Sequence, residues 1–183
     1  MSGADPSSGG PLIWVICGAG RGVGKTQLAL ALSRILPQAA YAKQGTSPRR
    51  PGKAESYYRT DEEMDVFLRE AEKAGHRHLV VESNALARRG RGDIIIFLED
   101  EVSVGGHGLS DDAPGGHGFL PGARPDADLL RSLAQVVLDR RGPGPDPAAW
   151  KLTLARKGLE PAMMGPVLEV LTAQAEWNRR TRA

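Results

Sequence analysis

Residues 12–26 read LIWVICGAGRGVGKT, and this stretch says most about the architecture of the chain. Its first six residues are apolar and rich in β-branched side chains, which is typical of a short strand buried within a sheet. Residues 19–26 follow the pattern A-x-x-x-x-G-K-T, the phosphate-loop pattern with alanine in place of its first glycine. Residues 27–36 place leucine and isoleucine at helical spacing, so the sequence predicts a strand, a glycine-rich turn and a helix in succession.

The residue types of this turn suit phosphate binding. Its glycines allow consecutive backbone N–H groups to turn toward one oxyanion, and the N-terminus of the following helix adds its positive dipole end. Lys25 would neutralise the outer phosphates, and Thr26 would offer its hydroxyl to Mg²⁺. Arg21 could contact a phosphate or point into solvent. We expect a nucleotide to contact the following residues: Gly20, Arg21, Gly22, Val23, Gly24, Lys25, Thr26 and Gln27.

Further apolar runs alternate with helical patterns, which predicts an α/β fold. Strands are expected over residues 39–43, 78–82 and 93–98. A capping box formed by Thr60 and Glu63 starts a helix that Gly75 ends, and Asp126 is expected to cap a later helix. Residues 135–139 fit either a strand or a continuation of that later helix, and the adjacent valines favour the strand.

We therefore predict a three-layer P-loop NTPase with a mostly parallel sheet and a C-terminal helical appendage. The length of 183 residues is about one domain. Glycine and proline, 23 and 13 residues, cluster where the chain is expected to be irregular. The expected parts are a flexible tail (1–11), the nucleotide-binding domain (12–141) with a Gly-rich loop near 101–124, and a linker with helices (142–183).

Composition narrows the class of protein. Hydrophobic residues make up 40% and charged residues 25%, which excludes disorder of the whole chain. Cys17 is the single cysteine, so no intrachain disulfide can form, and its apolar neighbours predict a buried thiol. Every apolar run is much shorter than the roughly 20 residues of a membrane span. We expect a cytoplasmic protein without a membrane segment.

Glu82 is the expected partner of Thr26 in holding Mg²⁺. It ends an apolar strand, and the carboxyl ends of parallel strands are where ligands bind in open α/β sheets. A carboxylate buried there without a cation would be costly. Together with Lys25, Glu82 is our candidate for catalytic work, because it could orient an attacking water. Ser83 and Asn84 could share this edge of the sheet or cap a helix.

The formal net charge is +2, but basic and acidic residues are distributed unevenly along the chain. Lys43, Arg49, Arg50 and Lys53 surround a loop and could grip a second phosphorylated ligand, although a solvated basic loop is the alternative. The later part of the predicted domain is acidic instead. An anionic ligand beside the nucleotide is therefore expected.

Three later features carry weaker signals. Asp139 could accept hydrogen bonds from guanine N1 and N2, or it could lie in a solvent-facing turn. His107 and His117 stand in a repeated Gly-Gly-His-Gly, which could bind metal but fits an exposed insertion better. The basic residues of the C-terminal helices are scattered, which argues against a nucleic-acid partner. Those helices are expected to cover the sheet or to form a homodimer contact.

About the first 100 residues resemble the small P-loop GTP-binding adaptor of molybdopterin-guanine dinucleotide biosynthesis. The matching positions are residues 19–26, Lys43, 51–53, 56–59 and 81–82. The family has a histidine-rich segment where this chain has Gln-Gly-Thr-Ser at 44–47, and Glu-Ser-Asn at 82–84 is closer to a poorly characterised related set. The resemblance implies a GTP-binding accessory protein that works beside a guanylyltransferase-type enzyme.

The sequence leaves the function open between different classes. One is an accessory protein that binds Mg²⁺ and GTP or ATP and hydrolyses the nucleotide weakly. Another is a small-molecule kinase in which Glu82 or Asp61 is the base and the basic loop holds the acceptor. A DNA-binding module built on the C-terminal helices is a further alternative. GTP is favoured over ATP by the resemblance alone.

Overall fold

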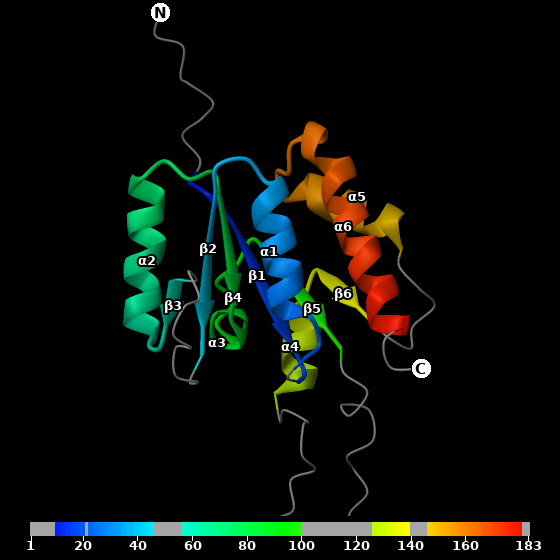
Figure 1. Ribbon diagram of the computed structural model, residues 1–183, viewed down its shortest axis with the longest axis horizontal. Coiled ribbons are helices and arrows are strands. Elements are labelled where there is room, and N and C mark those ends of the chain that lie inside the picture. Colours follow the sequence, from blue (N-terminus) through cyan, green and yellow to red (C-terminus); the bar gives the residue numbers. More distant parts are fainter. Residues whose placement is uncertain (1–9, 21, 46–55, 100–125, 140–145, 181–183) are drawn as a thin grey trace, which may run out of the picture.

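The computed structural model describes residues 10–20, 22–45, 56–99, 126–139 and 146–180. Over these residues, six strands form one sheet in the order β3-β2-β4-β1-β5-β6, and every neighbouring pair is parallel. The strands are β1 (Leu12–Gly18), β2 (Ala39–Gln44), β3 (Ser56–Tyr58), β4 (His78–Glu82), β5 (Ile94–Leu98) and β6 (Val136–Leu138). The carboxyl ends of the strands therefore meet along one edge, the lower edge of the sheet in Figure 1.

Helices cover both faces of this sheet, which gives three layers (Figure 1). The helices are α1 (Lys25–Ile35), α2 (Asp61–Lys73), α3 (Asn84–Arg88), α4 (Ala127–Leu133), α5 (Pro147–Arg156) and α6 (Pro161–Arg180). One face is covered by α1, α5 and α6, and the other by α2, α3 and α4. The predicted α/β fold with a parallel sheet is confirmed.

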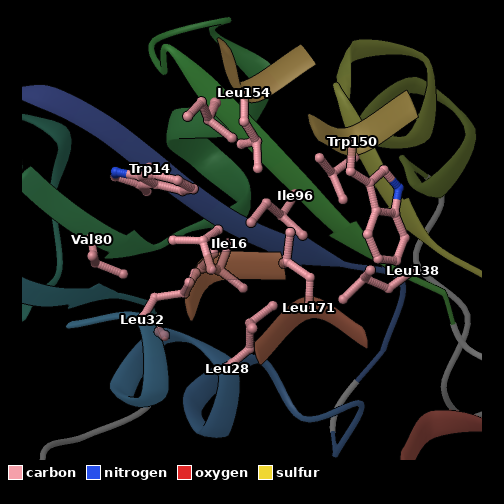
Figure 2. Packing of buried hydrophobic residues seen from close by; sticks show 14 of the residues in the cluster. Trp14, Ile16, Leu28, Leu32, Val80, Ile96, Leu138, Trp150, Leu154 and Leu171 are labelled. Carbon is pink, nitrogen blue, oxygen red and sulfur yellow. The ribbon is translucent and has the colours of Figure 1, made fainter. Parts of the chain in front are cut away.

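The alternation of side chains along β1 builds a core on each side. Trp14 and Ile16 face α1, α5 and α6, whereas Val15 and Cys17 face the other helices, and all four are fully buried. Figure 2 shows the first of these cores, in which residues from α1, α5 and α6 pack together against the sheet. Leu171 of α6 is completely buried there. The C-terminal helices thus belong to the same packed body as the sheet.

Most of the predicted boundaries hold within one or two residues. The capping box of Thr60 and Glu63 is formed at the start of α2, and Gly75 follows the end of that helix with a φ of +79°. Residues 136–138 form a strand, as favoured. Asp126 is the N-cap residue of α4, as predicted, but its side chain makes no capping hydrogen bond, and its carboxylate lies 2.5 Å from the Arg88 guanidinium.

The short strand β3 was not predicted from the sequence, whereas the short helix α3 begins where Ser83 was named as a possible helix cap. β3 extends the sheet beyond β2, and α3 follows directly on β4. No helix of the described residues has the length and apolar character that crossing a bilayer requires.

Candidate functional site

The glycine-rich turn joins β1 to α1 at the carboxyl edge of the sheet. Gly24 is the N-cap of α1 and has a φ of +88°, a conformation that favours glycine. Lys25 is the first residue of the helix, and its ammonium donates a hydrogen bond back to the carbonyl of Gly20. The first turn of α1, which the structure describes completely, contains no acidic residue. The positive end of the helix dipole therefore faces the turn without an opposing carboxylate of its own helix.

Asn84 anchors the start of this turn to the neighbouring strand. Its Oδ1 accepts from the N–H of Gly18 at 3.2 Å, and its Nδ2 donates to the carbonyl of Gly18 at 3.0 Å. On the other side, the N–H of Ala19 donates to the carbonyl of Leu98 at 3.1 Å. A Cβ on Gly18 would lie only 2.7 Å from that carbonyl oxygen, so this close approach requires glycine. Ser83 takes the capping role, because its Oγ accepts a backbone N–H of α3 at 2.9 Å.

Thr26, Glu82 and Lys43 meet beside the turn. The Thr26 hydroxyl donates to Glu82 Oε2 at 2.6 Å, and the Lys43 ammonium lies 3.0 Å from the same oxygen. Lys43 also donates to Thr26 Oγ1 at 2.9 Å. Lys43 and Glu82 are opposite each other in the register of β2 with β4, so both side chains project toward the face that α1 covers. The Glu82 side chain is 8% exposed and that of Lys43 is 29% exposed.

This arrangement corrects one premise of the sequence interpretation. Glu82 does lie at the predicted edge, next to Thr26, but its carboxylate is not left without a positive partner. The Lys43 ammonium supplies the balancing charge, so the cost of burying an unpaired carboxylate does not by itself demand a metal. Lys43 was named as a residue that could grip a second phosphorylated ligand, and in this structure its ammonium contacts Glu82 and Thr26.

A cleft of about 880 Å³ opens along this edge. Its walls are the turn and first residues of α1, the ends of β2 and β4, the starts of α2 and α3, and Trp177 of α6. Asp61, the alternative base, lies on the wall formed by α2. It accepts from Gln44 Nε2 at 2.7 Å and pairs with Arg89 at 2.8 Å. Ser83 Oγ donates to Gln44 Oε1 at 2.6 Å, so these side chains form one connected polar wall.

α6 lies over the glycine-rich turn, a contact that was not predicted. A Cβ on Gly24 would be 2.5 Å from Gln174 Nε2 and 3.1 Å from Trp177 Cζ3. Gln174 Nε2 donates to Asn178 Oδ1 at 2.9 Å, and both residues are buried. Trp177 lines the same cleft as Gly24. The available signal was the pair of amides spaced four residues apart, 174 and 178, which interrupts the apolar face of the helix.

Asp139 lies at the end of β6, in a cluster of its own. The Arg131 guanidinium contacts the carboxylate of Glu99 and, at 3.1 Å, that of Asp139. Burial raises the pKa of Glu99, and a hydrogen bond with Asp139 raises it further. Asp139 is not among the described residues that line the cleft with Lys25. The structure thus brings Thr26, Glu82 and Lys43 together and leaves Asp139 apart from them.

Several predicted site residues lie outside the described part of the chain. They are Arg21, Arg49, Arg50, Lys53, His107 and His117. Cys17 is buried as predicted, and burial raises the pKa of its thiol to about 12.

The donor set at Thr26 and Glu82 fits a magnesium ion that is bound together with phosphate. Both side chains offer hard oxygen atoms, as Mg²⁺ requires. Within the described ranges, no group of three or more His, Cys, Asp or Glu side chains could form a complete metal cage. Mg²⁺ commonly uses one or two protein oxygens and completes its shell with water and substrate phosphates. These two residues therefore suit a cation that arrives with a nucleotide.

Comparison with protein-family models, curated proteins and solved structures finds no match for this chain. Function is therefore inferred from the residues and their geometry.

Proposed function

We propose that this chain is a P-loop protein that binds Mg²⁺ together with GTP or ATP at the turn between β1 and α1. The observation that carries the proposal is the contact of the Thr26 hydroxyl with the Glu82 carboxylate, 56 residues apart in the sequence and 2.6 Å apart in space. This contact lies next to Lys25 at the N-terminus of α1. A phosphate-binding turn and an oxygen pair for a cation are thus adjacent, as nucleotide binding requires.

Each residue has a separate part in this proposal. Backbone N–H groups of residues 20–26 and the dipole of α1 attract the phosphates, and Lys25 neutralises their outer charge. Thr26 and Glu82 would hold the magnesium ion, which would neutralise part of the phosphate charge. Glu82 would also orient a water for slow hydrolysis through its carboxylate.

The biological setting that we propose follows from the resemblance described above. The chain would be an accessory or adaptor protein in molybdopterin-guanine dinucleotide biosynthesis, with a guanylyltransferase-type enzyme as partner. GTP is then the nucleotide, and hydrolysis is weak. The position of Lys43 at the end of β2 and of Glu82 at the end of β4 is consistent with the residues on which the resemblance depends.

A small-molecule kinase is the second candidate, and the size of the cleft favours it. The cleft extends past Glu82 to Arg59 and Asp61, which leaves a basic and an acidic side chain beyond the proposed phosphate site. An acceptor molecule could bind there. Glu82 and Asp61 are the two candidate bases, and each has partners: Glu82 contacts Thr26 and Lys43, and Asp61 contacts Gln44 and Arg89.

Titration calorimetry with GTP, ATP and their diphosphates in the presence of Mg²⁺ tests the nucleotide site. We expect saturable binding to the wild type and a loss of affinity of about tenfold or more in Lys25→Ala, because a charge-assisted phosphate contact is removed. Lys73→Ala is the control, since Lys73 lies on α2 with its side chain 73% exposed. The proposal fails if the wild type binds neither nucleotide. A phosphorylated product recovered from a metabolite mixture would favour the kinase.

A further inference from the structure

We propose that the Lys43 ammonium and Mg²⁺ are alternative partners of Glu82 and Thr26, so that the cation enters only when a phosphate group takes over Lys43. Lys43 would therefore make metal binding depend on the nucleotide. This inference deepens the proposed function and rests on it for the identity of the phosphate ligand. Its metal-binding part depends on Lys43, Thr26 and Glu82, whose Oε2 also accepts from the Tyr41 hydroxyl at 3.4 Å.

The distances show that the Lys43 ammonium and a magnesium ion would compete for the same two oxygen atoms, Thr26 Oγ1 and Glu82 Oε2. The ammonium of Lys43 is 2.9 Å from Thr26 Oγ1 and 3.0 Å from Glu82 Oε2, and these two oxygens are 2.6 Å apart. A magnesium ion bonded to both oxygens would lie about 2.1 Å from each, within a short distance of the ammonium. Two positive charges so close together repel each other strongly in a partly buried site.

The hydroxyl of Thr26 gives a second reason why Lys43 and a metal ion exclude each other from this site. It has one proton and two lone pairs, and here it donates the proton to Glu82 and accepts from Lys43. A metal ion would need a lone pair of Oγ1 together with an oxygen of Glu82. The hydrogen bond between Thr26 and Glu82 must then open, and the ammonium must withdraw from both oxygens.

Lys43 can withdraw because of its position and its side chain. It is next to last in β2, its flexible four-carbon stem borders the cleft, and its side chain is 29% exposed. A phosphate group held at Lys25 would offer the ammonium a new anionic partner across the same cleft. The nucleotide therefore raises the affinity for the metal, and by linkage the metal raises the affinity for the nucleotide by the same factor.

The test measures binding of Mn²⁺, as a paramagnetic substitute for Mg²⁺, by water-proton relaxation with the full chain. Without nucleotide, we expect Lys43→Met to bind Mn²⁺ about tenfold or more tightly than the wild type, because a repelling charge has been removed. Lys73→Met removes the same charge at an exposed site and should leave the affinity unchanged. The increase in Mn²⁺ affinity should disappear in the double variant Lys43→Met/Glu82→Gln.

Equal or weaker Mn²⁺ binding by Lys43→Met overturns the inference. Circular dichroism first establishes that the variant is folded, and Lys43→Gln, which keeps a donor without the charge, replaces it if it is not. A second experiment measures GTP affinity with and without Mg²⁺. The enhancement by Mg²⁺ should be large in the wild type and reduced in Lys43→Met. If the wild type binds no nucleotide, the proposed function fails, while the Mn²⁺ comparison still decides the competition.

Discussion

Substitution of Gly24 by alanine tests whether α6 is seated on the glycine-rich turn between β1 and α1. Two costs are expected. The φ of +88° is in the left-handed region, where a non-glycine residue loses roughly 1–2 kcal/mol. The new Cβ would also stand 2.5 Å from Gln174 Nε2 and 3.1 Å from Trp177 Cζ3. Relieving such overpacking costs roughly 1–3 kcal/mol, so the free energy of unfolding should fall by about 2–5 kcal/mol in total.

Gly158→Ala separates the two costs. Gly158 has nearly the same φ, +85°, but an added Cβ there would meet nothing within 4 Å. We therefore expect Gly158→Ala to lose only the backbone part, about 1–2 kcal/mol. The measurement is urea denaturation followed by circular dichroism. Adding Gln174→Ala to Gly24→Ala should recover part of the excess cost, because the clashing amide is then absent.

Equal destabilisation by Gly24→Ala and Gly158→Ala would refute the reasoning. It would mean that α6 does not press on the turn in solution, and that only the backbone conformation of Gly24 matters. If Gln174→Ala changes the free energy of unfolding by the same amount in the wild type and in the Gly24→Ala variant, the conclusion is the same, since the two sites would then be independent.

Two other measurements check buried groups of the core. Burial, and then the charge of Arg77, lowers the pKa of His78, and His78 Nδ1 accepts a hydrogen bond from Trp14 Nε1 at 3.3 Å. The contribution of neutral His78 to the free energy of unfolding is complete above the ordinary pKa of 6.5. It is lost as the pH falls through the lowered pKa of the folded state. Denaturation between pH 8 and pH 5 should show this loss, and a slope that is unchanged in His78→Leu would contradict it. Burial raises the pKa of the Cys17 thiol to about 12. A thiol reagent at pH 8 should therefore label the unfolded chain and hardly label the native protein. Rapid labelling of the native protein would contradict a buried thiol.

The helices and strands that could be predicted are those whose determining residues lie close together in the sequence. The apolar run of β1 and the turn after it are adjacent, and the capping box needs only Thr60 and Glu63, three residues apart. β3 could not be predicted in this way, because its three residues become a strand only by pairing with the end of β2. α3 has five residues, too few to show a helical period.

The candidate site at the carboxyl edge of the sheet was predicted in part, for the same reason. Thr26 and Glu82 follow from the ends of their own elements, whereas the partner of Glu82 depends on how two strands align. The placement of Gln174 over Gly24 depends on how α6 docks, which its amphipathic pattern leaves undetermined. Contacts between elements far apart in the sequence are set by packing, and packing is a property of the whole chain.

The alignment of β2 with β4 decides which ligand this cleft can accept. A shift by one residue would turn Lys43 to the opposite face of the sheet and leave the Glu82 carboxylate without its ammonium. In the observed alignment, Lys25 and Lys43 lie beside the carboxylate of Glu82 around Thr26, while Asp61 and Glu62 line the cleft at α2. Around Thr26 the two ammonium groups outnumber the Glu82 carboxylate, so we expect this end of the cleft to favour a phosphate group over a bare cation. We therefore expect metal and phosphate to bind together, as the proposed nucleotide site requires and a site for a metal alone would not.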